Sequence, residues 1–267
     1  MQGMNAVFHP TIALLQSSSL TTVVQQEIER AILAGEYEPG SKLIEATLAE
    51  KMGVSRGPVR EAFRTLEEAG LVRNEKNRGV FVRDIPIDEA VEIFDLRAAM
   101  DELVGRQLAR NITPAQLKEI KGLVDAMEKA VKAQNAHAYH LLNLGFHDRL
   151  VEMAGNRKLT AIYRKLIKEL SLFRRLNLAD GWLMPISASE HRQIVKAIAS
   201  GDADTAGRAM FDHVIESKER TIENDLRRQA RLQGGDAGTG AGQGAARATH
   251  LTDTSDTDRE RPKRGNR

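Results

Sequence analysis

The fold of this chain is decided by residues 44–82, which read IEATLAEKMGVSRGPVREAFRTLEEAGLVRNEKNRGVFV. Apolar residues recur at helical spacing as far as Gly53, which interrupts the pattern, and a second amphipathic series begins at Val59. Ser55 suits the N-cap of this second helix, and Pro58 falls in its first turn, where a missing backbone N–H costs little. The pattern therefore predicts a helix-turn-helix.

A β-hairpin, or wing, is expected directly after the second helix. Gly70 is suited to end that helix at the C′ position. Leu71–Arg73 and Gly79–Arg83 carry β-branched or aromatic residues, and the polar residues Asn74–Arg78 lie between them. We expect a two-stranded wing whose tip carries positive charge.

Positive charge is concentrated on this part of the chain. Residues 20–54 hold three Lys or Arg against six Asp or Glu, whereas residues 55–83 hold seven against four. Arg56 and Arg60 lie four apart on the face opposite the apolar stripe, and an arginine can hold guanine O6 and N7 with two donors. The alternative, a solvated hairpin on a core helix, does not account for so local a concentration of charge. The pattern indicates a DNA-contacting surface.

The run from Leu20 to Val82, with GEYEPGSKLIEATLAEKMGVSRGPVREAFRTLEEAGLV and NRGVFV, resembles the winged-helix domain of the GntR family of bacterial transcription regulators. Some relatives carry an arginine where this chain has Ala46, so their base preference is not carried over. The resemblance implies these DNA-binding residues: Ser55, Arg56, Gly57 and Arg60 on the recognition helix, and Asn77, Arg78 and Gly79 at the wing tip.

Length and composition are typical of a protein with two folded domains. The chain has 267 residues, 41% of them hydrophobic, and a net charge of only +2. It contains no cysteine, which excludes disulfides and thiol chemistry and favours a cytoplasmic location. No apolar run approaches the length of a membrane-spanning helix, so we expect no membrane partner.

The fold class expected is mainly α, a winged helix-turn-helix followed by an all-α bundle. Six of the eleven residues 234–244 are glycine, a composition that favours disorder. The predicted segments are a disordered leader (1–18), the winged-helix domain (19–85), an effector-binding and dimerisation bundle (86–231) and a disordered, Gly-rich basic tail (232–267).

Six helices are predicted within the bundle. Two motifs predict capping boxes at helix starts, one at Thr113–Gln116 and the other at Ser187–Glu190. The expected bounds are 88–110, a helix from Thr113, 136–154, 158–178, a helix from Ser187 to Gly201, and a long helix from Ala203.

Three of these helices carry side chains of the types that can act as metal ligands. Asn143 and His147 lie four apart and so project from the same side of one helix, and His191 and His213 lie on two others. Bundle metal sites are built in this way. The alternative is a set of hydrogen-bonded core histidines, and spacing alone does not separate the two. His140, one heptad before His147, is interpreted as a bystander.

The segments NLGFHDRLVEMAGNRKL and EHRQIVKAIASGDADTAGRAMFDHV resemble the FCD effector domain found in one branch of the GntR family. The resemblance implies a divalent metal held by one aspartate and three histidines, the latter being His147, His191 and His213. Asn143 stands at the aspartate position. Zinc is the first candidate for the metal, with nickel and manganese as alternatives, and a small acid would complete the coordination.

An asparagine ligand brings no negative charge, so the site should attract an anion more strongly. The resemblance implies that arginines clamp the acid group of the effector, and Arg97, Arg174 and Arg175 are the candidates. The alternative for Arg97 is an ion pair with Asp101, four residues on. A narrower similarity links the chain to regulators of phosphonate utilisation.

The function expected from these features is that of a ligand-responsive repressor, which binds a palindromic operator as a homodimer and senses a small organic acid or phosphonate. It is not expected to be an enzyme. One alternative is an HD-type metal-dependent phosphohydrolase, because His147 and Asp148 are adjacent and His140 precedes them. Another is a structural DNA-binding protein without an effector. The first leaves the winged helix unexplained, and the second leaves the histidines unexplained.

Overall fold

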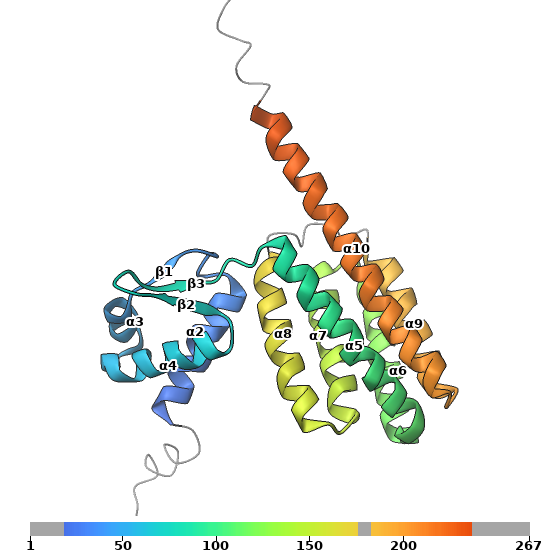
Figure 1. Ribbon diagram of the computed structural model, residues 1–267. Coiled ribbons are helices and arrows are strands. Elements are labelled where there is room, and N and C mark those ends of the chain that lie inside the picture. Colours follow the sequence, from blue (N-terminus) through green and yellow to red (C-terminus); the bar gives the residue numbers. More distant parts are fainter. Residues whose placement is uncertain (1–18, 176–182, 237–267) are drawn as a thin grey trace, which may run out of the picture. The chain divides into compact units, whose positions relative to one another are not determined.

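The computed structural model describes residues 19–175 and 183–236, within which nine helices and three short strands follow one another (Figure 1). The mainly α fold class is as predicted. The elements are α2 (Leu20–Ala34), β1 (Lys42–Leu43), α3 (Glu45–Met52), α4 (Arg56–Glu68), β2 (Val72–Glu75), β3 (Gly79–Val82), α5 (Ile87–Asn111), α6 (Pro114–Lys132), α7 (Ala136–Met153), α8 (Arg157–Arg175), α9 (Met184–Ala199) and α10 (Ala203–Asp236).

Helices α2, α3 and α4 form the N-terminal helical unit, in which α4 packs against both of the others. Val59 and Leu66 of α4 and Ile28 of α2 are fully buried, as the apolar spacing predicted. The chain turns sharply after α3 at Gly53, whose φ of 64° lies in the left-handed region that glycine adopts without strain. The helix-turn-helix is therefore present where it was expected.

The sheet has three strands and not the two that were predicted. Its order is β1-β3-β2, all antiparallel, with Lys42 opposite Phe81 and Leu43 opposite Val80. Two residues are too few to show the alternating pattern of a strand in the sequence. Only its pairing with β3 defines β1. The turn is also shorter than expected, since Glu75 pairs with Gly79 and leaves three residues at the tip.

Helices α5 to α9 and the first part of α10 form the bundle (Figure 1). α7 packs against α5, α6 and α8, and α9 packs against α5 and α6. The fully buried side chains of Phe146 and Leu150 on α7 meet those of Ile120 and Val124 on α6 in one apolar core.

The two predicted capping boxes have different outcomes. At Thr113 the box is formed, with Pro114 as the first helical residue. The box predicted at Ser187 is wrong, because α9 already begins at Met184, with a proline in its first turn. Ser187 therefore lies inside the helix, and Glu190 is left to interact elsewhere.

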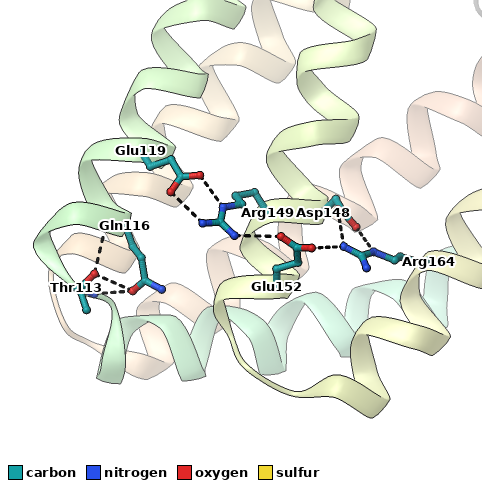
Figure 2. Close-up of polar contacts among 7 residues, drawn as sticks. All are labelled: Thr113, Gln116, Glu119, Asp148, Arg149, Glu152 and Arg164. Atoms are coloured by element: carbon teal, nitrogen blue, oxygen red, sulfur yellow. Dashed lines mark hydrogen bonds and ion pairs between the residues drawn. The ribbon is translucent and has the colours of Figure 1, made fainter. Parts of the chain in front are cut away.

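An ion-pair network on the outer surface joins α6, α7 and α8 (Figure 2). Arg149 bonds to Glu119 and Glu152, while Arg164 bonds to Asp148 and Glu152. Exposed pairs of this kind contribute about 0–1 kcal/mol each, so the network supports the bundle without holding it together.

Several predictions fall outside the described residues, namely the leader (1–18), the last residues of the helix expected at 158–178, and the tail from residue 237. Helix α10 runs to Asp236, past the boundary expected at residue 231. Among the described helices, none is long and apolar enough to cross a membrane.

Candidate functional site

The first candidate surface lies at the start of α4. Ser55 occupies the N-cap position as predicted, but its exposed hydroxyl makes no capping hydrogen bond. Arg56, Gly57 and Arg60 are also exposed, and a side chain at Gly57 would meet no atom within 4 Å. The N-terminus of α4 thus exposes a hydroxyl, a backbone segment without a side chain and two guanidinium groups to a binding partner.

Arg60 is held by a carboxylate that the sequence analysis did not single out. Its Nε and Nη2 donate to the two oxygens of Glu45 on α3, at 3.1 and 2.7 Å. The hydrogen bond from Arg60 lowers the pKa of Glu45, so the carboxylate stays ionised at neutral pH. The pair lies in a groove of about 490 Å³ that also includes Asn74 of β2 and Gly79 of β3.

The wing tip is a tight turn that exposes two cations, Lys76 and Arg78. Asn77 has a φ of 63° and Gly79 a φ of 106°, both in the left-handed region that these residue types tolerate. Arg78 pairs with Glu75 and lies over the ring of Phe81, with its guanidinium carbon 5.6 Å from the ring centre. The three predicted tip residues therefore lie together at one end of the hairpin.

The second candidate site is a cluster of three buried histidines, His147 of α7, His191 of α9 and His213 of α10. The Nε2 atom of His147 lies 3.2 Å from that of His191 and 3.3 Å from that of His213. The three side chains are at most 6% exposed. The structure thus brings together the three histidines that the sequence placed on different helices.

Their spacing fits a bound divalent metal. Three nitrogens at about 2.0–2.1 Å from a tetrahedral zinc ion are about 3.3 Å apart, close to the separations found here. Burial is the main cause that lowers the pKa of His191 well below its usual value, so this imidazole stays neutral, as a ligand must be. Within the described residues these histidines are the one group of three or more His, Asp or Glu side chains with ligand atoms close enough to share an ion.

The other residues named with the cluster are placed differently. Asn143 is half-buried one turn before His147 on α7, and so lies on the same side of the helix. His140 is not part of the cluster. Asp148 points outward, where Arg164 donates to both of its oxygens at 2.6 and 2.8 Å (Figure 2). An HD-type enzyme would need Asp148 beside His147 at the metal, which counts against that alternative.

Arg97 is buried and takes part in the ion pair that was considered as the alternative for it. Its Nε lies 3.2 Å from Oδ2 of Asp101 and donates to the hydroxyl of Tyr163 at 3.1 Å. Burial raises the pKa of Asp101 to about 6, against the opposing effect of Arg97, so the carboxylate is ionised at neutral pH. The charge of Arg97 also helps to lower the pKa of His191, which places the guanidinium near the histidines.

The hydrogen bond of Arg97 to Tyr163 and its ion pair with Asp101 both involve Nε. Arg174 and Arg175 stand at the end of α8, but their side chains fall outside the described residues. Of the three candidate arginines, Arg97 is the one that the structure relates to the cluster.

Two residues that support the histidine cluster were missed by the sequence analysis. Glu190 accepts a hydrogen bond from His213, with its Oε2 2.7 Å from Nδ1, and Arg220 donates to both oxygens of Glu190 at 2.7 and 2.9 Å. The signal for Arg220 was its position seven residues after His213, on the same side of α10. Glu190 had been assigned to a capping box that does not form.

Family models match two parts of the chain. Residues 20–82 match the model described as bacterial regulatory proteins, gntR family, and residues 92–216 match the FCD domain. The second range contains the three histidines, Arg97 and Glu190, and the first contains the candidate residues of α4 and the wing.

Curated relatives align with both parts at once. The "Probable D-xylose utilization operon transcriptional repressor" of Paenarthrobacter nicotinovorans is 29% identical over 202 residues, which cover 75% of this chain and 88% of the relative. The gluconate operon transcriptional repressor of Bacillus licheniformis is 26% identical over 71% of this chain and 80% of its own length. The transcriptional repressor RspR of Escherichia coli K12 is 25% identical, with coverages of 74% and 85%.

Two solved structures share the fold. A GntR transcriptional regulator from Rhodococcus sp. RHA1 superposes with a TM-score of 0.65 at 24% identity, covering 77% of this chain and 99% of its own. McbR/YncC of E. coli also gives 0.65, at 19% identity, with coverages of 77% and 98%.

The buried Arg97–Asp101 pair leads to a stability prediction. Asp101→Ala leaves the Arg97 charge uncompensated in the bundle, so the free energy of unfolding should fall by about 3–5 kcal/mol in urea titrations. Adding Arg97→Met should recover most of the loss. Asp125→Ala, which breaks an exposed pair with Arg192, is the matched control and should cost about 1 kcal/mol or less. A loss for Asp101→Ala as small as that of the control would contradict the assignment.

Proposed function

The chain belongs to the GntR family of bacterial transcription regulators and carries an FCD domain, and on this premise we propose that it is a ligand-responsive repressor. It binds a palindromic operator as a homodimer through α4 and the wing, and the histidine cluster with Arg97 senses a small anionic metabolite. The convergence of the three Nε2 atoms beside a buried arginine carries this proposal. Several relatives are named as repressors of catabolic operons, which agrees with it.

Operator recognition is supported by the exposure of the α4 start and the wing tip. Arg56 and Arg60 can reach base edges in a major groove, and Arg78 can reach the minor groove or the phosphates. One winged domain makes few contacts, so two copies on a two-fold site are the usual solution. The bundle is the proposed dimerising part.

The recognition residues can be tested by substitution. Arg56→Ala and Arg60→Ala should each weaken cognate operator binding by about 1–3 kcal/mol and relax base preference, as measured by mobility-shift titration against operator variants. Glu45→Gln should act in the same direction as Arg60→Ala but more weakly, because Arg60 keeps its charge and loses its orientation. Arg30→Ala on α2, another exposed arginine in an ion pair, is the control. Wild-type affinity in both arginine variants of α4 would remove this helix from the interface.

The proposed metal ligands are His147, His191 and His213, with the amide oxygen of Asn143 as the fourth protein ligand. A divalent metal, with zinc as first choice and nickel or manganese as alternatives, would supply a positive centre for an acid group. Imidazole nitrogens suit these ions, and the interior position excludes most competing solvent.

The metal content of the protein is expected to depend on the histidines of the cluster and not on histidines outside it. The double variant His191→Ala/His213→Ala should lose the stoichiometric metal found in wild type by elemental analysis, because two of three imidazole ligands are gone. His137→Ala, an exposed histidine of the same helix as His147, should retain it. Equal metal content in the double variant and wild type would rule out the site.

The proposed effector is a small anion that contacts the metal and Arg97. Asn143 adds no charge to the site, and the guanidinium of Arg97, which pairs with Asp101 through Nε, has the planar donor geometry that suits an acid group. Phosphonates, including aminoalkyl phosphonates, are the first candidates and dicarboxylates the second. Effector binding lowers operator affinity if the ligand prefers a dimer geometry that no longer matches the half-site spacing, and the operator must then weaken effector binding by the same factor.

Asn143→Asp tests the charge argument. An added carboxylate should tighten metal binding and weaken a dianionic effector, as measured by calorimetric titration of the metal-loaded protein with and without operator. Asn135→Asp, at the N-cap of the same helix and outside the cluster, adds the same charge as a control. Unchanged effector affinity in Asn143→Asp would show that the charge of this side chain does not select the ligand.

A further inference from the structure

We propose that Glu190 is a positioning residue of the histidine cluster: it holds His213 in the tautomer whose Nε2 lone pair points at His147 and His191, and Arg220 holds Glu190 in place. The role in metal binding rests on the proposed function. The hydrogen-bond arrangement itself does not, because it is formed by Glu190, His213 and Arg220 alone.

The first step is the hydrogen bond between His213 and Glu190. The distance of 2.7 Å between Nδ1 and Oε2 is at the short end for a charge-assisted bond, and both side chains are at most 12% exposed. An ionised carboxylate can only accept, so the hydrogen of the neutral imidazole must sit on Nδ1. Nε2 of His213 is then free of hydrogen and carries the lone pair that a metal requires.

The second step is the fixed orientation of the carboxylate. Arg220 donates from Nη1 to Oε1 at 2.7 Å and from Nη2 to Oε2 at 2.9 Å. This two-point contact prevents rotation of the carboxylate. Oε2 therefore remains aimed at His213.

The third step is that this support is specific to one histidine. Glu190 precedes His191 directly in α9, so the two side chains leave the helix in different directions, His191 into the cluster and Glu190 toward α10. Nδ1 of His191 is buried and has no hydrogen-bond partner among the described residues. His213 is the ligand whose tautomer the carboxylate can set.

Glu190 bonds to His213, and other carboxylates lie near this pair. A groove of about 410 Å³ between α9 and α10 is lined by His213, Glu190 and other acidic residues, among them Asp212 and Glu216. Asp212 is exposed and makes no recorded hydrogen bond or ion pair within the described part of the chain. It therefore offers a substitution of equal charge in the same groove that leaves the His213 bond intact.

The tautomer is tested first, in the metal-free wild-type protein. Long-range 1H–15N correlation spectra should assign the hydrogen of His213 to Nδ1. In Glu190→Gln, Arg220 should bind the amide oxygen and turn the NH2 group toward His213, which reverses the tautomer. A hydrogen on Nε2 of His213 in the wild-type protein would overturn the proposal, and this measurement needs no variant to fold.

The consequence for metal affinity is tested with Zn2+ alone. The affinity is measured by competition with a chromophoric chelator. Glu190→Gln should bind Zn2+ about 10–100-fold more weakly than wild type, the usual effect of removing such a partner, while Asp212→Asn should stay within about two-fold. Equal affinities in the two variants would overturn the proposal. If wild type binds no Zn2+, Ni2+ or Mn2+, the metal site fails, and the spectra alone decide the role of Glu190.

Discussion

The burial of three imidazole rings in an apolar helical bundle is the constraint on which the effector domain depends. A buried polar nitrogen without a partner costs about 1–3 kcal/mol, and here Nε2 of His147 lies 3.2 Å from that of His191 and 3.3 Å from that of His213. A shared cation satisfies all three at once, whereas hydrogen bonds between neutral rings cannot. Helices α7, α9 and α10 must therefore keep their positions along the bundle axis relative to one another. The surface ion pairs that join α7 to α6 and α8 also oppose sliding of these helices (Figure 2).

Three arginines of this protein, Arg60, Arg97 and Arg220, are each held by a carboxylate, and their surroundings differ. Arg60 is exposed, so its pair with Glu45 orients the guanidinium without burying it. Arg97 is buried and pairs with Asp101 through Nε. Arg220 spends two nitrogens on Glu190 and so supports a neighbouring group. The same side chain type thus occurs in an exposed pair, in a buried pair and as the support of a neighbouring carboxylate.

Much of this was available from the sequence. The apolar period and Gly53 located the helix-turn-helix, the local excess of Lys and Arg predicted a DNA-facing surface on it, and Thr113–Gln116 marked the start of α6. The histidines were found because residues at helical spacing on separate helices can share an interior. These features are local, since propensity, caps and periodicity act within a few residues, and the sequence states them directly.

What only the tertiary structure decided are pairings between residues far apart in the chain. Glu45 and Arg60 are 15 positions apart, His213 and Glu190 are 23 apart, and Arg97 and Tyr163 are 66 apart. Strand β1 is defined by its partner β3 alone, and the start of α9 at Met184 freed Glu190 from the expected cap. By itself the sequence determined which residue types face the interior or the solvent, because burial follows periodicity. The packing of the helices decided which carboxylate meets which cation, because a side chain's partner depends on the register between helices, and no local pattern encodes it.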